Sequence, residues 1–412
     1  MARSYTLFFI LLNSLNGSLL AQNTPAPDKK DSITLANKTK ELKPPLPDIK
    51  DIEVIQMMQL WDVNTFQNSG NTPGQNRNDV YIRRGRIGVK GMLRKNLSFY
   101  VLFAYDGIGR DKNTAGNGSP NPQDNHDFYL WDAMWTWSPK PMFNVTAGYF
   151  RPQVGRENIS SAFNVISMDK ALTNFQPRTN IIGRNTGRET GVNVGGFHRG
   201  MGWSFNYNVG FFDMTSTTIV GAGSRWFPLL TGRAAFTIGD PEMDKYKLSY
   251  VQSYYGRRRG ITFAVNGTYQ GETEIFKQND FYGADILANY KHWDFIIEYD
   301  WLYRNSIITT KTQKTTDAVY SFKCGYNFVQ KNGRIIQPTF MYSGQTAANY
   351  GGKEYINSLT TATTQYVYDA GINYLINKDK LKLNVHYVCG QQKDKTNAPS
   401  FSYAVAGFQY TF

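Results

Sequence analysis

Basic side chains at two-residue spacing are the clearest candidate functional groups in this sequence. Arg84, Arg86 and Lys90 share one face of a predicted strand, Val80 to Leu93, whose other face is largely aliphatic. Since alternate side chains of a strand point the same way, these cations would stand at intervals of about 7 Å or multiples of it. Such a row attracts anions, and each arginine fits two phosphate oxygens. The alternative is a set of arginines that acidic side chains elsewhere on the wall neutralise.

A second group of cations lies in the longest segment without strand alternation, residues 151–188. Glu157 and Asp169 balance only part of its positive charge. If the strands enclose a channel, we expect this loop to reach into it and to place its cations at the constriction, where selectivity is decided. The alternative is that the loop covers the mouth or contacts a neighbouring subunit. The candidate anion-binding residues of this segment are Arg151, Arg156, Arg178, Arg184 and Arg188.

Alternating hydrophobicity predicts that most of the chain is β-strand. From about Val54 onward, apolar and polar side chains alternate in segments long enough to cross a bilayer at a tilt. In the clearest segment, residues 293–303, aromatic and aliphatic side chains alternate with Asp294, Glu298 and Asp300. Strands of membrane barrels have this pattern because lipid-facing and lumen-facing side chains take turns. The sequence therefore predicts an all-β fold, a transmembrane antiparallel β-barrel.

Short and long connections also alternate along the chain. In outer-membrane barrels the short turns are periplasmic and the long loops are extracellular. The count reaches sixteen strands, an even number as a closed antiparallel barrel requires, with both termini periplasmic and a last strand Phe401 to Phe412. The predicted short turns are residues 94–96, 138–141, 199–200, 291–292, 331–333 and 377–380. The predicted long loops include residues 151–188, 215–229, 305–314, 344–364 and 391–400.

One segment leaves the strand number open. Residues 241–260 must be a periplasmic connection for the count of sixteen to hold, although Tyr246 to Tyr255 also fits a strand, which would give seventeen. Within this segment, Arg257, Arg258 and Arg259 are interpreted as part of a solvated turn.

Composition agrees with a barrel but does not distinguish it from a secreted, soluble all-β protein. The chain is 41% hydrophobic and 15% aromatic, with a negative mean hydropathy. After the first twenty residues no apolar run approaches the roughly 18 residues of a membrane helix. Phe412 ends an alternating strand together with Tyr410 and Phe408, and a terminal aromatic residue resembles the signal that directs barrels to the outer membrane.

The N-terminal residues predict export. Residues 1–21 combine Arg3, an apolar stretch and a small-residue cleavage site, and therefore resemble a signal peptide. Residues 22–52, rich in proline and mixed charge, are expected to be a flexible periplasmic segment, and residues 53–412 the barrel in the outer membrane. The formal net charge of +13 does not indicate a nucleic-acid partner, because the chain has an export signal and no recognisable binding motif.

Three motifs resemble the phosphate-selective porin O and P family. These are the arginine-rich strand Arg83 to Gly91, the turn Phe150-Arg151-Pro152 with Gly155 and Glu157, and Pro177-Arg178 followed by Gly191 to Gly196. The resemblance is best over residues 80–200. It implies a sixteen-stranded, homotrimeric porin with a basic channel that passes small anions such as phosphate and is surrounded by outer-membrane lipid.

The sequence also bears on other classes of function. The sequence has no Gly-x-Ser-x-Gly or His-Glu-x-x-His motif, and its four histidines are scattered, so an enzyme is not expected. Cys324 and Cys389 fall in separate predicted strands, and no metal, nucleotide or redox cofactor is implied. A general non-selective porin and a plugged structural or secretion-associated barrel that binds partner proteins remain open.

Overall fold

The computed structural model describes residues 50–66, 76–111, 114–115, 128–184, 186–217, 220–221, 225–307, 313–346, 364–392 and 401–412. The chain divides into two units, Met1–Asp48 and Ile49–Phe412. The predicted signal peptide and nearly all of the predicted N-terminal segment lie outside the described residues.

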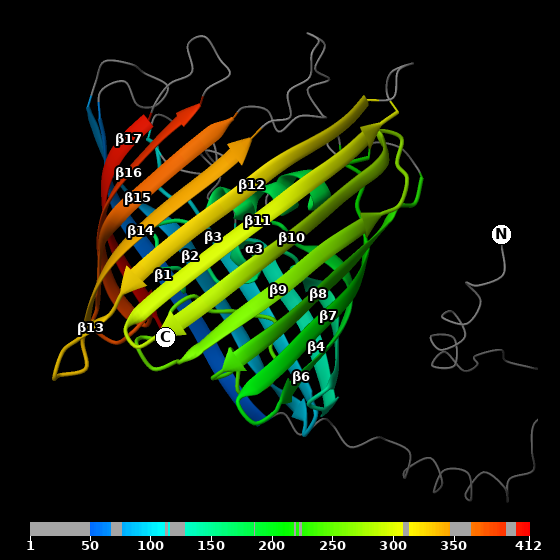
Figure 1. Ribbon diagram of the computed structural model, residues 1–412, viewed down its shortest axis with the longest axis horizontal. Coiled ribbons are helices and arrows are strands. Elements are labelled where there is room, and N and C mark those ends of the chain that lie inside the picture. Colours follow the sequence, from blue (N-terminus) through cyan, green and yellow to red (C-terminus); the bar gives the residue numbers. More distant parts are fainter. Residues whose placement is uncertain are drawn as a thin grey trace, which may run out of the picture. The chain divides into compact units, whose positions relative to one another are not determined.

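The second unit is one antiparallel sheet of seventeen labelled strands that closes on itself (Figure 1). The strands are β1 Lys50–Thr65, β2 Arg77–Arg94, β3 Leu97–Tyr105, β4 Tyr129–Lys140, β5 Phe143–Phe150, β6 Glu189–Arg199, β7 Trp203–Asp213, β8 Pro228–Gly239, β9 Gly260–Gln270, β10 Phe276–Tyr290, β11 Trp293–Ser306, β12 Gln313–Tyr326, β13 Phe328–Val329, β14 Ile335–Thr346, β15 Gln365–Leu375, β16 Leu381–Gln392 and β17 Phe401–Thr411.

The barrel has sixteen crossing strands, which confirms the predicted number. β13 has two residues and continues β12 after Asn327, since both pieces pair with β14. The sheet closes where β1 pairs with β17, from Met57 opposite Thr411 to Thr65 opposite Tyr403. Residues 240–259, all of which are described, form no strand and connect β8 to β9. The seventeen-strand alternative is therefore wrong.

Side chains alternate between the two faces of the wall as the sequence predicts. In β11, Trp293, Ile297 and Trp301 are exposed, whereas Asp294 and Asp300 between them are buried inside the barrel. The outer face therefore presents apolar and aromatic surface to lipid. The inner face carries most of the charged side chains of the strands.

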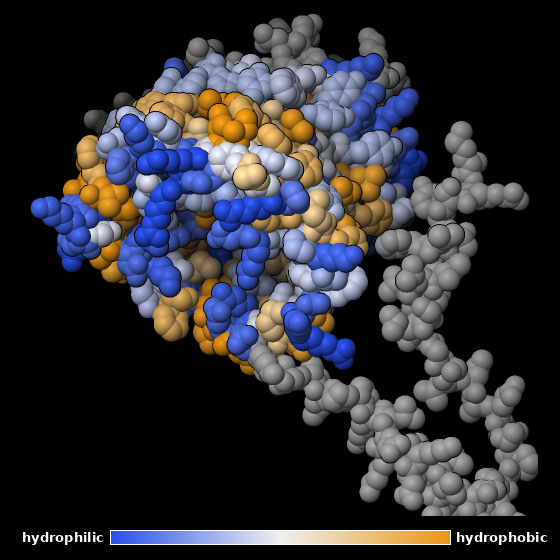
Figure 2. Space-filling view, turned by 60° about the horizontal axis from the view of Figure 1, so that its bottom comes forward, coloured by the Kyte–Doolittle hydropathy of each residue, from blue (hydrophilic) through white to orange (hydrophobic). Residues whose placement is uncertain are grey.

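Both chain ends of the barrel lie at the end that carries the short connections, which we call the turn end. β1 begins there, and the backbone N–H of Phe412 donates to the carbonyl of Gln56 at 2.7 Å. β4 continues to Lys140, so the predicted turn 138–141 is shorter than expected and is made by Pro141 and Met142. Figure 2, in which this end comes forward, shows hydrophilic residues around a recess and hydrophobic residues on the flanks.

The long connections lie at the opposite end, the loop end. The longest described one joins β5 to β6 and contains three short helices: α3 Arg156–Ile159, η2 Leu172–Asn174 and η3 Pro177–Ile182. The helices of the described part of the chain are too short and too polar to cross a bilayer.

Candidate functional site

Residues 151–188 cross the interior of the barrel, as expected. They bond to inward side chains of strands on the far wall as well as the near one. The N–H of Met168 donates to Asp369 of β15 at 2.8 Å, and Asn373 of β15 donates to the carbonyl of Ile166 at 2.7 Å. We call this segment the constriction loop.

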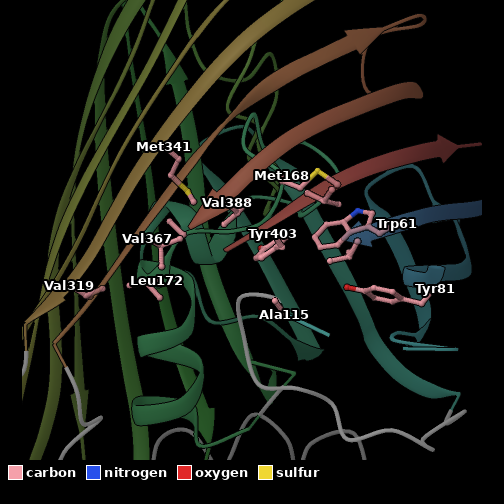
Figure 3. Packing of buried hydrophobic residues seen from close by; sticks show 13 residues of the cluster. Trp61, Tyr81, Ala115, Met168, Leu172, Val319, Met341, Val367, Val388 and Tyr403 are labelled. Atoms are coloured by element: carbon pink, nitrogen blue, oxygen red, sulfur yellow. The ribbon is translucent and has the colours of Figure 1, made fainter. Parts of the chain in front are cut away.

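An apolar cluster fixes the far side of the constriction loop. Met168, Ala171 and Leu172 of the loop pack against buried side chains of the wall (Figure 3). The wall residues of this cluster include Trp61, Tyr81, Val319, Met341, Val367, Val388 and Tyr403. Burial of this surface favours the inward position of the loop, because each large apolar side chain that leaves water contributes roughly 1.5–3 kcal/mol.

A second apolar cluster fixes the near side. Val154, Ile181 and Ile182 of the constriction loop pack against Phe212 and Phe281, which come from β7 and β10. The loop is therefore attached at both sides of the lumen. Its polar backbone spans the space between the two apolar clusters.

Buried ion pairs reinforce the beginning of the loop. Arg156 of α3 pairs with Asp285 of β10 at 2.5 Å and with Glu242 at 2.6 Å. The adjacent Glu157 accepts from the ammonium group of Lys323 of β12 at 2.6 Å. Burial alone would raise the pKa of Glu157, but Lys323 and Lys170 hold this pKa below its ordinary value. The carboxylate therefore stays charged and keeps its partners.

The connection between β8 and β9 also lies inside the barrel, at the turn end. Tyr250 forms a bridge with Ser160 of the constriction loop, and its hydroxyl donates to Asn206 of β7 at 3.1 Å. Gln252 donates to Glu157 at 2.5 Å. We call residues 240–259 the inner turn.

The inner turn corrects one interpretation from the sequence. Arg257 and Arg259 are exposed, but Arg258 is buried and donates to Asn289 of β10 at 2.6 Å and to Thr262 of β9 at 2.7 Å. Arg258 is therefore a structural residue of the barrel interior and is not solvated. The three consecutive arginines look alike in the sequence, and only partners from other strands distinguish Arg258.

Five of the predicted site residues come together where the constriction loop approaches β2 and β4. We call Arg84, Arg86, Arg151, Arg178 and Arg188 the basic cluster. Arg188 and Arg84 lie close enough to Arg178 to repel its positive charge. In the same way, the charge of Arg151 is repelled by Arg188, Arg178 and Arg86. Strand and loop positions far apart in the sequence thus build one concentration of positive charge.

Three carboxylates neutralise part of this charge. Asp169 of the loop pairs with Arg84 and also with Arg83, at 2.7 Å from the latter. Asp106 pairs with Arg86. Asp132 of β4 pairs with Arg188 at 3.2 Å.

Arg151 and Arg178 have no carboxylate partner among the residues that the structure describes. Arg151 donates to the backbone carbonyls of Asn158 and Ser160. Arg178 lies over the ring of Phe175, 5.8 Å from its centroid. Burial, followed by the charges of Arg188 and Arg84, lowers the pKa of Arg178 to about 9. Burial and Arg188 likewise lower the pKa of Arg151 well below its ordinary value. Both arginines are thus placed where an anion would relieve unfavourable electrostatics.

The other predicted residues lie elsewhere. Lys90 pairs with Glu53 at 2.7 Å near the turn end, and its side chain remains 45% exposed. Arg156 is fully buried between Asp285 and Glu242, so it holds the loop rather than facing a passage. Arg184 pairs with Glu189 at 2.9 Å.

Two residues at the site do not follow the alternating pattern of inward and outward side chains, because each lies at a β-bulge. Arg83 is the extra residue of β2 opposite Gln59 and Leu60, and it turns toward Asp169 although strict alternation faces it to lipid. Trp131 is the extra residue of β4 opposite Leu102 and Phe103. Its ring contacts both Arg86 and Arg188. Bulges re-aim side chains in this way, and no pattern in the sequence locates them.

Within the described ranges, no group of three or more His, Cys, Asp or Glu side chains is arranged to hold a metal ion. Cys324 and Cys389 are free thiols in β12 and β16. His386 bonds to Asp369 at 2.5 Å and to Asn373 at 3.1 Å, inside the barrel wall.

A sixteen-stranded barrel with an inward loop defines a channel protein of the porin class. The chain belongs to the phosphate-selective porin O and P family, whose model matches residues 56–232 and 342–412. It is an outer-membrane porin. No curated protein matches the chain.

Solved porin structures share the fold at low sequence identity. The anion-selective porin of Comamonas acidovorans is 10% identical with a TM-score of 0.57, over 88% of this chain and 99% of that one. OprB of Pseudomonas putida is 10% identical with a TM-score of 0.57, over 88% and 94%. The outer-membrane channel DcaP of Acinetobacter baumannii is 13% identical with a TM-score of 0.52, over 88% and 97%.

Proposed function

We propose that this porin conducts anions in preference to cations and that phosphate-like oxyanions bind at the basic cluster. The observation that carries the proposal is the pair Arg151 and Arg178, two partly buried cations without carboxylate partners among the described residues. In a site of low dielectric, such charges attract anions strongly and repel cations.

The chemistry of the cluster favours oxyanions. Guanidinium groups donate paired hydrogen bonds that match two oxygens of phosphate, and they are less strongly hydrated than ammonium groups. The Nε atoms of Arg151 and Arg178 bond to no described group. These donors therefore replace part of the water that an entering phosphate loses.

The decisive experiment is a planar-bilayer recording across a salt gradient. We expect a reversal potential that shows anion preference and a chloride current that phosphate blocks. Arg151→Gln combined with Arg178→Gln should reduce both effects. Arg225→Gln is the matched control, because Arg225 is exposed at the loop end and pairs with Glu272. A current carried mainly by cations, or one unchanged in the double variant, would contradict the proposal.

A plugged barrel that binds partner proteins is a second candidate function, because both the constriction loop and the inner turn occupy the lumen. It predicts no steady current from the folded protein. Deletion of the inner turn would then open a current that the intact chain lacks.

We further propose a homotrimer in outer-membrane lipid, exported by a signal peptide cleaved after Ala21. The family resemblance supports the trimer, and the sequence of residues 1–21 supports the signal peptide. Native mass spectrometry of the extracted protein should give three chains, and N-terminal sequencing of the mature chain should begin at Gln22.

A further inference from the structure

Three neighbouring strands place an amide and a carboxylate together on the inner wall. Asn266 of β9, Gly283 of β10 and Asp300 of β11 are partners in register. A Cβ atom on Gly283 would lie 1.7 Å from Oδ1 of Asp300 and 2.8 Å from Nδ2 of Asn266. The side chains of Asn266 and Asp300 therefore meet over the glycine, in space that any other residue would fill.

Glu298 adds a second carboxylate on the same face, two residues before Asp300. Its Oε2 accepts from the backbone N–H of Glu157 at 2.9 Å and from the hydroxyl of Thr173 at 3.1 Å. Its Oε1 points toward Gly155, where a Cβ atom would lie 2.9 Å away. The two carboxylates thus lie where the wall meets the beginning of the constriction loop.

Four oxygens of this cluster bond to no described group. They are both oxygens of Asp300, Oε1 of Glu298 and Oδ1 of Asn266. Asp300 and Glu298 are fully buried, and Asn266 is 8% exposed. The amide of Asn266 is itself unpartnered, so the cluster consists of more than acidic side chains.

The neighbouring cations are engaged by other carboxylates. Arg233 binds Asp285, and Arg156 binds Asp285 and Glu242. Lys323 binds Glu157 and Ser167, at 2.6 and 2.8 Å. Burial of two adjacent carboxylates without a counter-charge is very unfavourable, so the pair must be neutralised, either by protons or by a bound cation.

We propose that Glu298, Asp300 and Asn266 bind one divalent cation of the calcium type. A single shared proton would still leave one buried negative charge. A divalent cation neutralises both carboxylates and engages all four oxygens. Carboxylate and amide oxygens are the ligands that Ca²⁺ prefers, with water completing its coordination. The bound cation would tie β9 and β11 to the constriction loop through Glu298.

The test uses the full mature chain, refolded from inclusion bodies into detergent so that it carries no lipopolysaccharide, and treated with EDTA. Calorimetric titration with CaCl₂ at neutral pH should show one equivalent bound per chain. The temperature of unfolding, followed by the change in electrophoretic mobility on heating, should rise with Ca²⁺ and fall again with EDTA.

Two variants and one control make the test specific. Asp300→Asn and Glu298→Gln each remove one charged ligand, so each should weaken Ca²⁺ binding by more than roughly tenfold and abolish the rise in unfolding temperature. Glu272→Gln removes an exposed carboxylate at the loop end and should leave both unchanged. Absence of Ca²⁺ binding by the wild-type chain would overturn the proposal, even if a variant fails to refold. Binding that survives both substitutions would overturn it as well.

Discussion

Arg188 stacks on Trp131, with its guanidinium carbon 3.7 Å from the ring centroid. Arg86 contacts the same ring at 3.9 Å. The indole thereby holds two like charges side by side. Arg86 also pairs with Asp106, and Arg188 pairs with Asp132. A cation over an aromatic face gains roughly 0.5–2 kcal/mol, depending on its exposure to water. An uncharged residue thus holds two arginines of the basic cluster beside each other.

Replacement of this ring should disturb the cluster. Trp131→Leu removes both cation–π contacts, so we expect a lower anion preference in the reversal potential and a barrel less stable by about 1–3 kcal/mol. The matched control is Trp301→Leu, because Trp301 lies on the outer face of β11. An unchanged reversal potential in Trp131→Leu would show that the ring does not position the arginines.

The buried pair Glu157 and Lys323 should be important for stability. Lys323→Met leaves the carboxylate of Glu157 without its closest charged partner, which typically costs about 3–5 kcal/mol. Addition of Glu157→Gln should recover part of this loss, because the remaining buried charge is then removed. Unfolding temperatures of the two single variants and the double variant measure this coupling. Strictly additive effects would contradict it.

Asp169 should make the stability of the folded barrel depend on pH. Burial alone would raise its pKa, but Arg83 and Arg84 hold the pKa below its ordinary value. A lowered pKa in the folded state contributes stability that is fully present above about pH 4 and is lost as the pH falls through the folded-state value. Asp169→Asn should therefore lower the unfolding temperature at neutral pH, and the difference from wild type should shrink below about pH 4. A difference that stays constant down to strongly acid pH would exclude this role.

The inner turn should limit conductance. The backbone N–H of Asp240 already donates to the carbonyl of Arg259 at 2.9 Å. Replacement of residues 241–258 by Asn-Gly would therefore close a tight hairpin between β8 and β9. We expect a larger single-channel conductance, because the removed residues occupy the lumen at the turn end. The control is Lys245→Gln with Lys247→Gln, which alters exposed charges of the same segment without shortening it. Equal conductance of the shortened and intact chains would contradict the expectation.

Strand number and facing were accessible from the sequence because the environment of a barrel wall is periodic. Lipid on one side and a polar lumen on the other impose a period of two, which places Trp301 outside and Asp300 inside. The same reasoning gave the inward faces of Arg84 and Arg86. It failed at Arg83 and Trp131, because a bulge adds one residue and reverses the facing locally.

The alternating pattern does not predict which cations of the constriction loop are neutralised by carboxylates and which join the basic cluster. Arg156 and Arg178 look equivalent in the sequence, since both are arginines in one long loop. The structure buries Arg156 between Asp285 and Glu242, whereas Arg178 joins Arg84 and Arg188. These partners come from strands and turns up to about 130 residues away, so only the closed barrel decides which cations are neutralised.

The sequence by itself determined a sixteen-stranded barrel, its outward and inward faces and a surplus of positive charge, because these follow from local periodicity and composition. The tertiary structure decided where that charge is concentrated. It placed the constriction loop and the inner turn inside the lumen, where apolar clusters and buried ion pairs hold them. Such contacts depend on which distant strands become neighbours when β1 meets β17, and no local pattern encodes that closure.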